Sequence, residues 1–185
     1  TLRHVQCAFT YFLKDPTNIR NIAALGVGAL PDIGVYPTVT TRFATGAEPQ
    51  RVSARVDFDP VFMTDVFSSI RADFGAFELS FYLSTQLANR QLMVFHGDKG
   101  FIEVLAPFNA SLYAHDTVIL HNQRHDGAEV FRYPGVNQYK LEVEAFARVA
   151  GGAKEHTFTL ESSKQNQLLI DAIFAAGKSG NWEKV

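Results

Sequence analysis

The sequence has one cysteine, no long apolar run and no excess of basic residues, and each shortage excludes a class of protein. Cys7 has no partner for an internal disulfide, and its strand-like neighbours predict a small buried side chain. The longest apolar run, 168–176, is interrupted by Asp171 and falls short of the ~20 residues that a membrane span needs. With 17 basic and 19 acidic residues, the chain lacks the basic surface typical of nucleic-acid binding. We therefore expect neither a membrane nor a nucleic acid as a partner.

The first residues carry no targeting signal. Thr1 to His4 include neither an initiator methionine nor a hydrophobic signal region. We therefore expect a cytoplasmic protein, with an export signal further upstream as the alternative. The chain opens in a segment with the pattern of a strand, which predicts that it was cut from a longer protein.

The composition predicts a single folded domain over residues 1–185. The residues are 46% hydrophobic and 19% charged, which excludes a disordered tail. A chain of this length buries roughly 70% of its unfolded surface. No internal repeat, low-complexity tract or linker divides it.

Alternation of apolar and polar residues predicts a large sheet. In 77–83, for example, Phe77, Leu79 and Phe81 alternate with Glu78 and Ser80. Turn residues separate the alternating segments, which favours hairpins and an antiparallel sheet with one packed face. The expected strands, about eight in number, are 2–11, 52–58, 62–74, 77–83, 91–96, 101–105, 117–121 and 128–133.

Three other segments have the spacing of helices: 30–45, 137–150 and 161–177. In the first, Pro31 suits the first turn and Gly46 suits the position after the last. Pro37 removes a backbone hydrogen bond and should kink this helix. Helices clustered at both ends of a run of hairpins predict an α+β fold.

Two motifs point to sites that we do not assign. Residues 26–31 begin like a dinucleotide-binding loop, but the third glycine is replaced by Pro31, and no βαβ unit surrounds it. Glycines that ease entry into a helix explain this loop better. His115, His121 and His125 share no single face, and no carboxylate or thiol completes a ligand set. We therefore interpret them as solvated loop histidines and expect no metal site.

Asp32 and Tyr36 form the one candidate for acid–base chemistry. They are four residues apart, so on a helix they share one face. A tyrosine exchanges a proton near neutral pH only when a nearby cation lowers its pKa. The alternative is that Asp32 interacts with the helix dipole and Tyr36 packs. Arg20, in a polar stretch, either holds a substrate hydroxyl or phosphate or forms a surface ion pair.

Two stretches carry a resemblance to a known family: 15–21, DPTNIRN, and 26–37, GVGALPDIGVYP. They resemble the Gfo/Idh/MocA oxidoreductases, and most closely the branch of glucose-fructose oxidoreductase and dihydrodiol dehydrogenase. That branch carries Asn-Ile-Arg-Asn followed by Gly-Gly-Gly-Ala-Leu-x-Asp-Ile-Gly-x-Tyr-Pro. Weaker matches continue, in the family's order, at 41–49, 137–146 and 161–173. Val27 and Pro31 depart from the branch's pattern, but neither removes a chemical group, so they bear on specificity more than on reaction class.

The resemblance implies the C-terminal substrate and oligomerisation domain of an NAD- or NADP-dependent oxidoreductase acting on a sugar or polyol. Such a domain is an open-faced sheet with helices packed on one face, and its partner is an N-terminal Rossmann domain, which is absent here. That domain would bind the cofactor and supply a lysine, so this chain has no cofactor-binding residue and should be inactive alone.

The resemblance also implies roles for four residues. Tyr36 matches the branch's acid–base tyrosine, and Asp32 matches the carboxylate that orients the substrate or the lysine. Arg20 matches a residue near the junction of cofactor and substrate. Tyr139 either lines the substrate entrance or packs.

Two other functions stay open. A non-catalytic module could keep the family fold and only bind or dimerise, because a broad sheet face is a ready surface for a homo-oligomer. An unrelated carbohydrate-binding domain is suggested by the aromatic content alone. Aromatics at a spacing of two are more typical of a sheet core than of sugar platforms.

Overall fold

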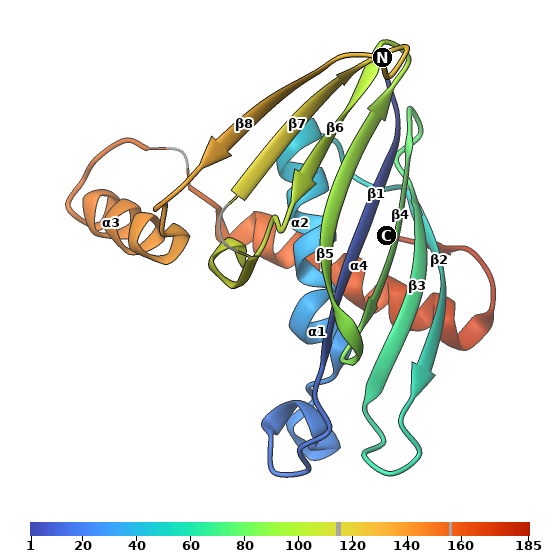
Figure 1. The fold of residues 1–185 in the computed structure, drawn as a ribbon. Helices are drawn as coiled ribbons and strands as arrows, with labels where there is room; N and C mark the ends of the chain where they lie inside the picture. The colour runs from blue at the N-terminus through green and yellow to red at the C-terminus, as the bar shows by residue number, and fades with distance from the viewer. Residues whose placement is uncertain (114–115, 156) are drawn as a thin grey trace.

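A single nine-stranded sheet forms the body of the protein (Figure 1). The computed structural model describes residues 1–113, 116–155 and 157–185, and the strands named here lie within them. Their order across the sheet is β8-β7-β6-β5-β1-β4-β3-β2-β9. The strands are β1 (Leu2–Phe12), β2 (Arg51–Phe58), β3 (Asp65–Asp73), β4 (Glu78–Ser84), β5 (Gln86–Gly97), β6 (Gly100–Leu105), β7 (Asp116–Asn122), β8 (Ala128–Tyr133) and β9 (Glu183–Lys184).

The sheet is antiparallel except at its centre. β1 pairs in parallel with β4 and antiparallel with β5, and the remaining neighbours are antiparallel. The α+β class and the mainly antiparallel sheet predicted from the sequence are confirmed. The parallel pair and the short β9 were not predicted, because the alternation within a strand does not reveal which strands lie beside it.

One predicted strand begins later than expected. The segment 62–74 forms a strand only from Asp65, because residues 59–64 make a turn in which Met63 has a φ of 59°. Asp59 holds this turn, since one of its carboxylate oxygens accepts the backbone N–H groups of Val61 and Phe62 at 2.8 and 3.0 Å.

The predicted helices all form, and the first is split. The helical elements are η1 (Ile19–Asn21), η2 (Ala23–Leu25), α1 (Ala29–Ile33), α2 (Val35–Thr45), η3 (Ala110–Tyr113), α3 (Gln138–Ala150) and α4 (Leu160–Ser179). The break lies at Gly34 rather than at Pro37. Pro37 lacks the N–H that would bond the Ile33 carbonyl, so the helix is interrupted at that carbonyl, and Pro37 falls in the tolerant first turn of α2. Gly46 ends α2 in the left-handed conformation, as predicted.

Three helices, α1, α2 and α4, cover one face of β1 to β4 and supply the core. Val5, Cys7 and Phe9 of β1 point to these helices and are at least 95% buried, whereas Gln6 between them is exposed. The burial predicted for Cys7 is confirmed. The fully buried side chains include Leu30, Ile70, Leu79, Leu83, Leu169 and Ile173.

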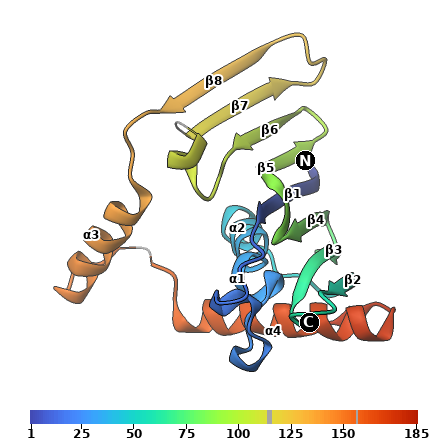
Figure 2. The same cartoon turned by 60° about the horizontal axis from the view of Figure 1, so that its bottom comes forward.

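Two parts of the molecule extend beyond this core. β6, β7 and β8 form a wing that reaches past the helices, and α3 stands apart from the sheet (Figure 2). Neighbouring residues Val130 and Phe131 of β8, which point to opposite faces, are each 44% exposed. No residue of α3 is buried, so the expectation that the helices pack on one face is wrong for α3. In the described parts of the chain, no helix is long and apolar enough to cross a membrane.

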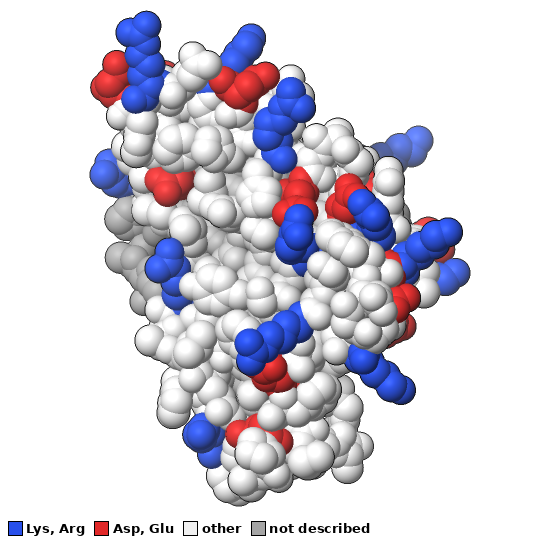
Figure 3. Space-filling model, turned by 90° about the vertical axis from the view of Figure 1, so that its right-hand side faces the viewer, with Lys and Arg blue, Asp and Glu red and all other residues white. Residues whose placement is uncertain are grey.

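Charged side chains near the β2–β9 edge of the sheet, away from the wing, form ion pairs. Arg51 bonds Asp73 and Arg71 bonds Glu78 across β2, β3 and β4, and both guanidinium groups lie against the ring of Trp182. On the face shown in Figure 3, basic and acidic side chains are interspersed, and neither sign forms a continuous patch.

Candidate active site

A polar cleft of about 340 Å³ lies where the end of β1 meets η1, α1 and the start of α2. Larger hollows of about 410 and 490 Å³ lie over the centre of the sheet and at the β7–β8 turn, but none of the four residues predicted to act on a substrate lines either of them. The cleft is lined by Phe9, Thr10, Tyr11, Leu13, Arg20, Asp32, Ile33, Tyr36, Asn89, Gln91, Asn109 and Tyr139. It therefore brings together all four residues predicted to act on a substrate.

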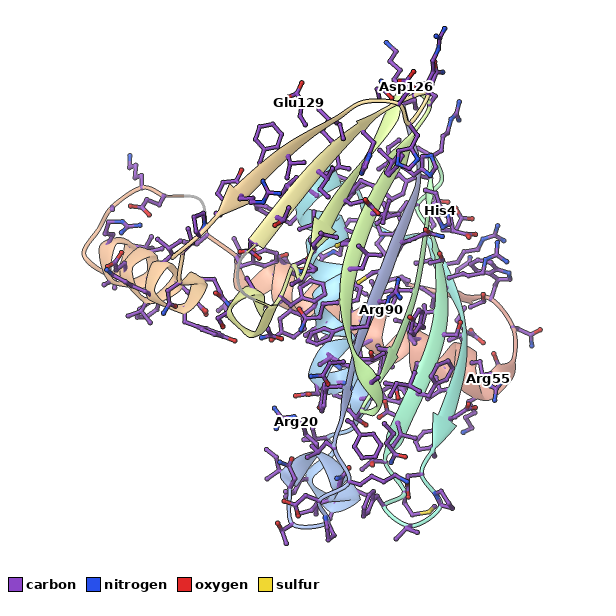
Figure 4. The ribbon with its side chains drawn as sticks, in the orientation of Figure 1. His4, Arg20, Arg55, Arg90, Asp126 and Glu129 are labelled. Carbon is purple, nitrogen blue, oxygen red and sulfur yellow. The ribbon has the colours of Figure 1, made fainter. Side chains whose placement is uncertain are left out.

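Asp32 is held on both of its oxygens. Oδ1 lies 2.8 Å from Nε of Arg20, and Oδ2 accepts a 2.6 Å hydrogen bond from the hydroxyl of Tyr11. Arg20 is positioned by η1, whose N-cap Asn18 accepts the Arg20 backbone N–H, and Figure 4 shows its side chain at the lower end of the sheet. Asp32 also lies in the first turn of α1, where a negative charge is favoured by the helix dipole. Its position in the helix and its ion pair with Arg20 are therefore compatible.

The two partners of Asp32, Tyr11 and Arg20, each keep their proton through neutral pH. Burial and the hydrogen bond to Asp32 raise the pKa of Tyr11 far above its ordinary value, so its phenol stays protonated and keeps donating. The hydrogen bond to Asp32 raises the pKa of Arg20, which is therefore a permanent cation at the cleft. The sequence did not identify Tyr11 as a site residue. The alternation along β1 places it on the helix-facing side with Phe9, which is the one signal that could have pointed to it.

Tyr36 presents a free hydroxyl to the cleft. Its ring packs edge-on against Phe9, with ring centroids 5.4 Å apart, and lies tilted against Phe108 at 5.1 Å. The residue is 38% exposed. Burial raises the pKa of Tyr36, and the negative charge of neighbours such as Asp32 raises it further against the opposing effect of Arg20. Among the described residues, no group bonds the Tyr36 hydroxyl, so it is available to a ligand.

The other side of the cleft is built from amides. Oε1 of Gln91 accepts the backbone N–H groups of Phe108 and Asn109 at 3.2 and 3.0 Å. Nε2 of Gln91 donates to Oδ1 of Asn109 at 2.7 Å, and Nδ2 of Asn109 donates to the hydroxyl of Tyr139 at 3.3 Å. Tyr139, on the first turn of α3, therefore joins the cleft and is 56% exposed. Gln91 and Asn109 carry no recognisable motif, so the sequence did not single them out.

A buried carboxylate supports the loop beneath the cleft. Asp65 of β3 accepts the backbone N–H of Leu30 at 2.5 Å and so occupies the N-terminus of α1. A Cβ on Gly28 would lie 1.9 Å from an oxygen of Asp65, which explains why this position is glycine. Burial raises the pKa of Asp65. A carboxylate placed here excludes a phosphate from this helix end, which agrees with rejecting the dinucleotide-binding loop.

The histidines form no metal site in the described residues, where no group of three or more potential ligands lies close together. The interpretation as solvated loop histidines is wrong for His121, which lies on β7 and is 9% exposed. It is buried because Phe101 of β6 stacks on it at 4.2 Å and Glu103 bonds its Nε2 at 2.8 Å. His125 packs edge-on against His121, and His115 lies outside the described residues.

The fold is thus an open, mainly antiparallel sheet covered on one face by helices, with a polar cleft where β1 meets them. The chain belongs to the GFO/IDH/MocA family: the model of the family's C-terminal domain matches residues 1–103. The resemblance seen in the sequence is confirmed.

The chain is similar to curated proteins about twice its length. It is 35% identical to an uncharacterized oxidoreductase of Rhizobium meliloti over 188 residues, covering 100% of this chain and 56% of the relative. It is 28% identical over 176 residues to a dTDP-3,4-didehydro-2,6-dideoxy-alpha-D-glucose 3-reductase of Actinomadura kijaniata, covering 93% and 52%. The chain thus spans about half the length of these relatives.

Solved structures share the fold. The aldose-aldose oxidoreductase of Caulobacter crescentus, complexed with glycerol, superposes with a TM-score of 0.85 at 21% identity, over 100% of this chain and 56% of that one. A 3-ketoreductase of Actinomadura kijaniata, in complex with NADP and TDP-benzene, superposes with a TM-score of 0.84 at 24% identity, over 95% and 54%.

Proposed function

We propose that this chain is the substrate domain of an NAD- or NADP-dependent oxidoreductase that interconverts a hydroxyl and a carbonyl group of a sugar or polyol. The observation that carries the proposal is the free phenol of Tyr36 in a cleft beside the ion-paired Arg20 and Asp32. A proton donor next to a fixed cation is what a carbonyl oxygen needs as it becomes a hydroxyl.

The cleft suits a small polyhydroxy ligand. Its volume, about 340 Å³, is at the low end for ligand pockets. Hydroxyl, amide and charged groups line it, whereas a ligand with a large apolar part would leave them unpaired. The names of two similar proteins, a reductase of a deoxy-keto sugar and an aldose-aldose oxidoreductase, support the same substrate class.

The cofactor is held mainly outside this chain. A dinucleotide exceeds the cleft, and Asp65 excludes a phosphate from the N-terminus of α1. The relatives are long enough to contain a second, nucleotide-binding domain, and the similar 3-ketoreductase binds NADP. Tyr36 and Arg20 would be the residues of this chain that face the nicotinamide, which would supply the hydride when bound.

Residues of this chain account for the proton transfer. When a carbonyl is reduced, its carbon gains a hydride and its oxygen takes the Tyr36 proton, which the raised pKa keeps in place. Arg20, held by Asp32, stabilises negative charge on that oxygen. In the oxidation direction Tyr36 must accept a proton, which requires a further cation to lower its pKa. Because the hydride comes from a cofactor held mainly outside this chain, we expect the isolated chain to be inactive.

Reconstitution tests the proposed function. The chain is joined behind the part of the Rhizobium meliloti oxidoreductase that it does not cover, and the fusion is screened with NAD, NADP and their reduced forms against aldoses, keto sugars and polyols. We expect sugar-dependent change in nicotinamide absorbance from the fusion and none from the chain alone. A folded fusion that binds the nucleotide but turns over no sugar or polyol contradicts the proposal.

We also propose that a second copy of this chain covers the open face of the sheet. Val130 belongs to this face, because its cross-strand partners lead through Ile119, Glu103 and Val94 to Gln6, opposite the helices. Leu105 lies on the same face, and Val130 at 44% and Leu105 at 37% leave apolar surface exposed there, which is typical of a subunit contact.

The test compares two neighbours of equal exposure. Val130→Lys should convert an oligomer into a monomer, measured by light scattering after gel filtration, because the charge must be buried in the contact. Phe131→Lys, which is 44% exposed on the opposite face, is the control and should leave the mass unchanged. A monomeric parent chain, or dissociation by the control alone, contradicts the proposal.

A further inference from the structure

The proton transfer described above uses one side of the cleft and leaves the amide side without a role. Gln91 is 91% buried on the side of β5 that lines the cleft, and all the hydrogen bonds of its carboxamide go to the loop that follows β6. Because Oε1 accepts two backbone N–H groups, Nε2 must be the end that faces Asn109. The orientation of the Asn109 carboxamide follows, with Oδ1 toward Gln91 and Nδ2 toward Tyr139.

Asn109 keeps unused hydrogen-bonding capacity. Its Oδ1 accepts one bond and has a second lone pair, and its Nδ2 donates one bond, at 3.3 Å, and has a second N–H. One acceptor and one donor on a neutral group match an alcohol, which donates and accepts at the same atom. A carboxylate or a phosphate would find no cation at this side of the cleft in the described residues.

Asn109 is also tied to the reacting side. The residue before it, Phe108, stacks on Phe9 at 5.0 Å and packs against Tyr36 at 5.1 Å. Tyr36 and Asn109 line the same cleft, so a ligand whose carbonyl or hydroxyl group meets Tyr36 has its other carbons in the space that Asn109 also lines.

We propose that Asn109 binds a substrate hydroxyl other than the one that reacts at Tyr36, and so selects among sugars and polyols. The inference rests on the proposed function and deepens it. Gln91 is a positioning residue that holds Asn109 through the 2.7 Å hydrogen bond. A site built around a hydroxyl discriminates strongly against a ligand that lacks it, because the buried polar group is then left unpaired.

A series of deoxy sugars tests the inference by binding, without turnover. The chain is titrated with D-glucose, D-galactose and D-xylose at millimolar concentrations and followed by amide NMR spectra. The sugar bound most tightly is then compared with analogues that each lack one hydroxyl. We expect one analogue to bind about tenfold more weakly than its parent, the effect of one lost hydrogen bond. In Asn109→Ala, the parent and this analogue should bind equally, as in a double-mutant cycle.

The controls separate a specific contact from a change in the loop. Ser111→Ala changes an exposed side chain in the same loop that does not line the cleft, and it should keep the tenfold discrimination. If Asn109→Ala does not fold, Asn109→Ser keeps a polar residue in the loop while shortening its reach, and it should lose the discrimination.

The outcomes distinguish the inference from the function beneath it. If Asn109→Ala or Asn109→Ser discriminates between the parent and deoxy sugars as the unmodified chain does, the inference is overturned and the sugar site at Tyr36 stands. If the unmodified chain binds none of the three sugars, aldoses are excluded as its ligands and the inference fails, whereas the proposed function is still decided by the fusion screened with keto sugars and polyols.

Discussion

Replacement of Tyr36 by phenylalanine should lower the rate of carbonyl reduction by about 10²–10⁴-fold, the usual contribution of a positioned proton donor. The measurement is nicotinamide oxidation by the reconstituted fusion with its best sugar. The phenylalanine ring keeps the contacts to Phe9 and Phe108, so the loss reports the hydroxyl and not the packing. Substrate binding should change much less than turnover.

The pH dependence gives a second signature of the same residue. Burial raises the pKa of Tyr36, so its protonated form persists through neutral pH and is lost as the pH rises above that raised value. The reduction rate should therefore be level near neutrality and fall in alkali, and Tyr36→Phe should lack this fall.

The matched control is Tyr82→Phe, which removes a phenol from the open face of β4. It should leave both the rate and its pH dependence unchanged. Full activity in Tyr36→Phe would remove Tyr36 from the mechanism.

Gly28→Ala should lower the free energy of unfolding by about 2–4 kcal/mol, the sum expected for overpacking and a lost buried hydrogen bond. The added Cβ would lie 1.9 Å from an oxygen of Asp65, so the carboxylate must move away from the backbone N–H of Leu30. Urea unfolding of the chain measures the change. Because α1 carries Asp32, the same substitution should weaken sugar binding.

The control combines Gly28→Ala with a second substitution, Asp65→Ala. Asp65→Ala removes the atoms that the new Cβ meets, so Gly28→Ala should cost clearly less stability in that background than alone. Equal cost in the two backgrounds would show that the contact with Asp65 is not the reason for glycine at this position.

Part of the candidate site could be predicted from the sequence. Arg20, Asp32 and Tyr36 lie on one continuous stretch, and the resemblance to the family is enough to single them out. Tyr11 and Asn109 come from distant segments and carry no motif. Only the position of β1 beside β5, and of the loop after β6 beside Gln91, brings them to the same cleft.

The sequence by itself determined the local elements of this protein and their buried sides. Alternation at a spacing of two predicted the strands and the burial of Cys7, and Gly46 ended its helix as expected. These features depend on residues that are close in the sequence, so a short segment is enough to specify them.

Only the tertiary structure decided which distant segments of the chain lie side by side. The parallel pairing of β1 with β4, the burial of His121 beneath Phe101, the exposed α3 and the contact of Asp65 with α1 all join residues far apart in the chain. Alternation says which side of a strand is buried but not which strand lies beside it. That choice depends on how the whole chain packs, because long loops must close before distant contacts contribute any stability.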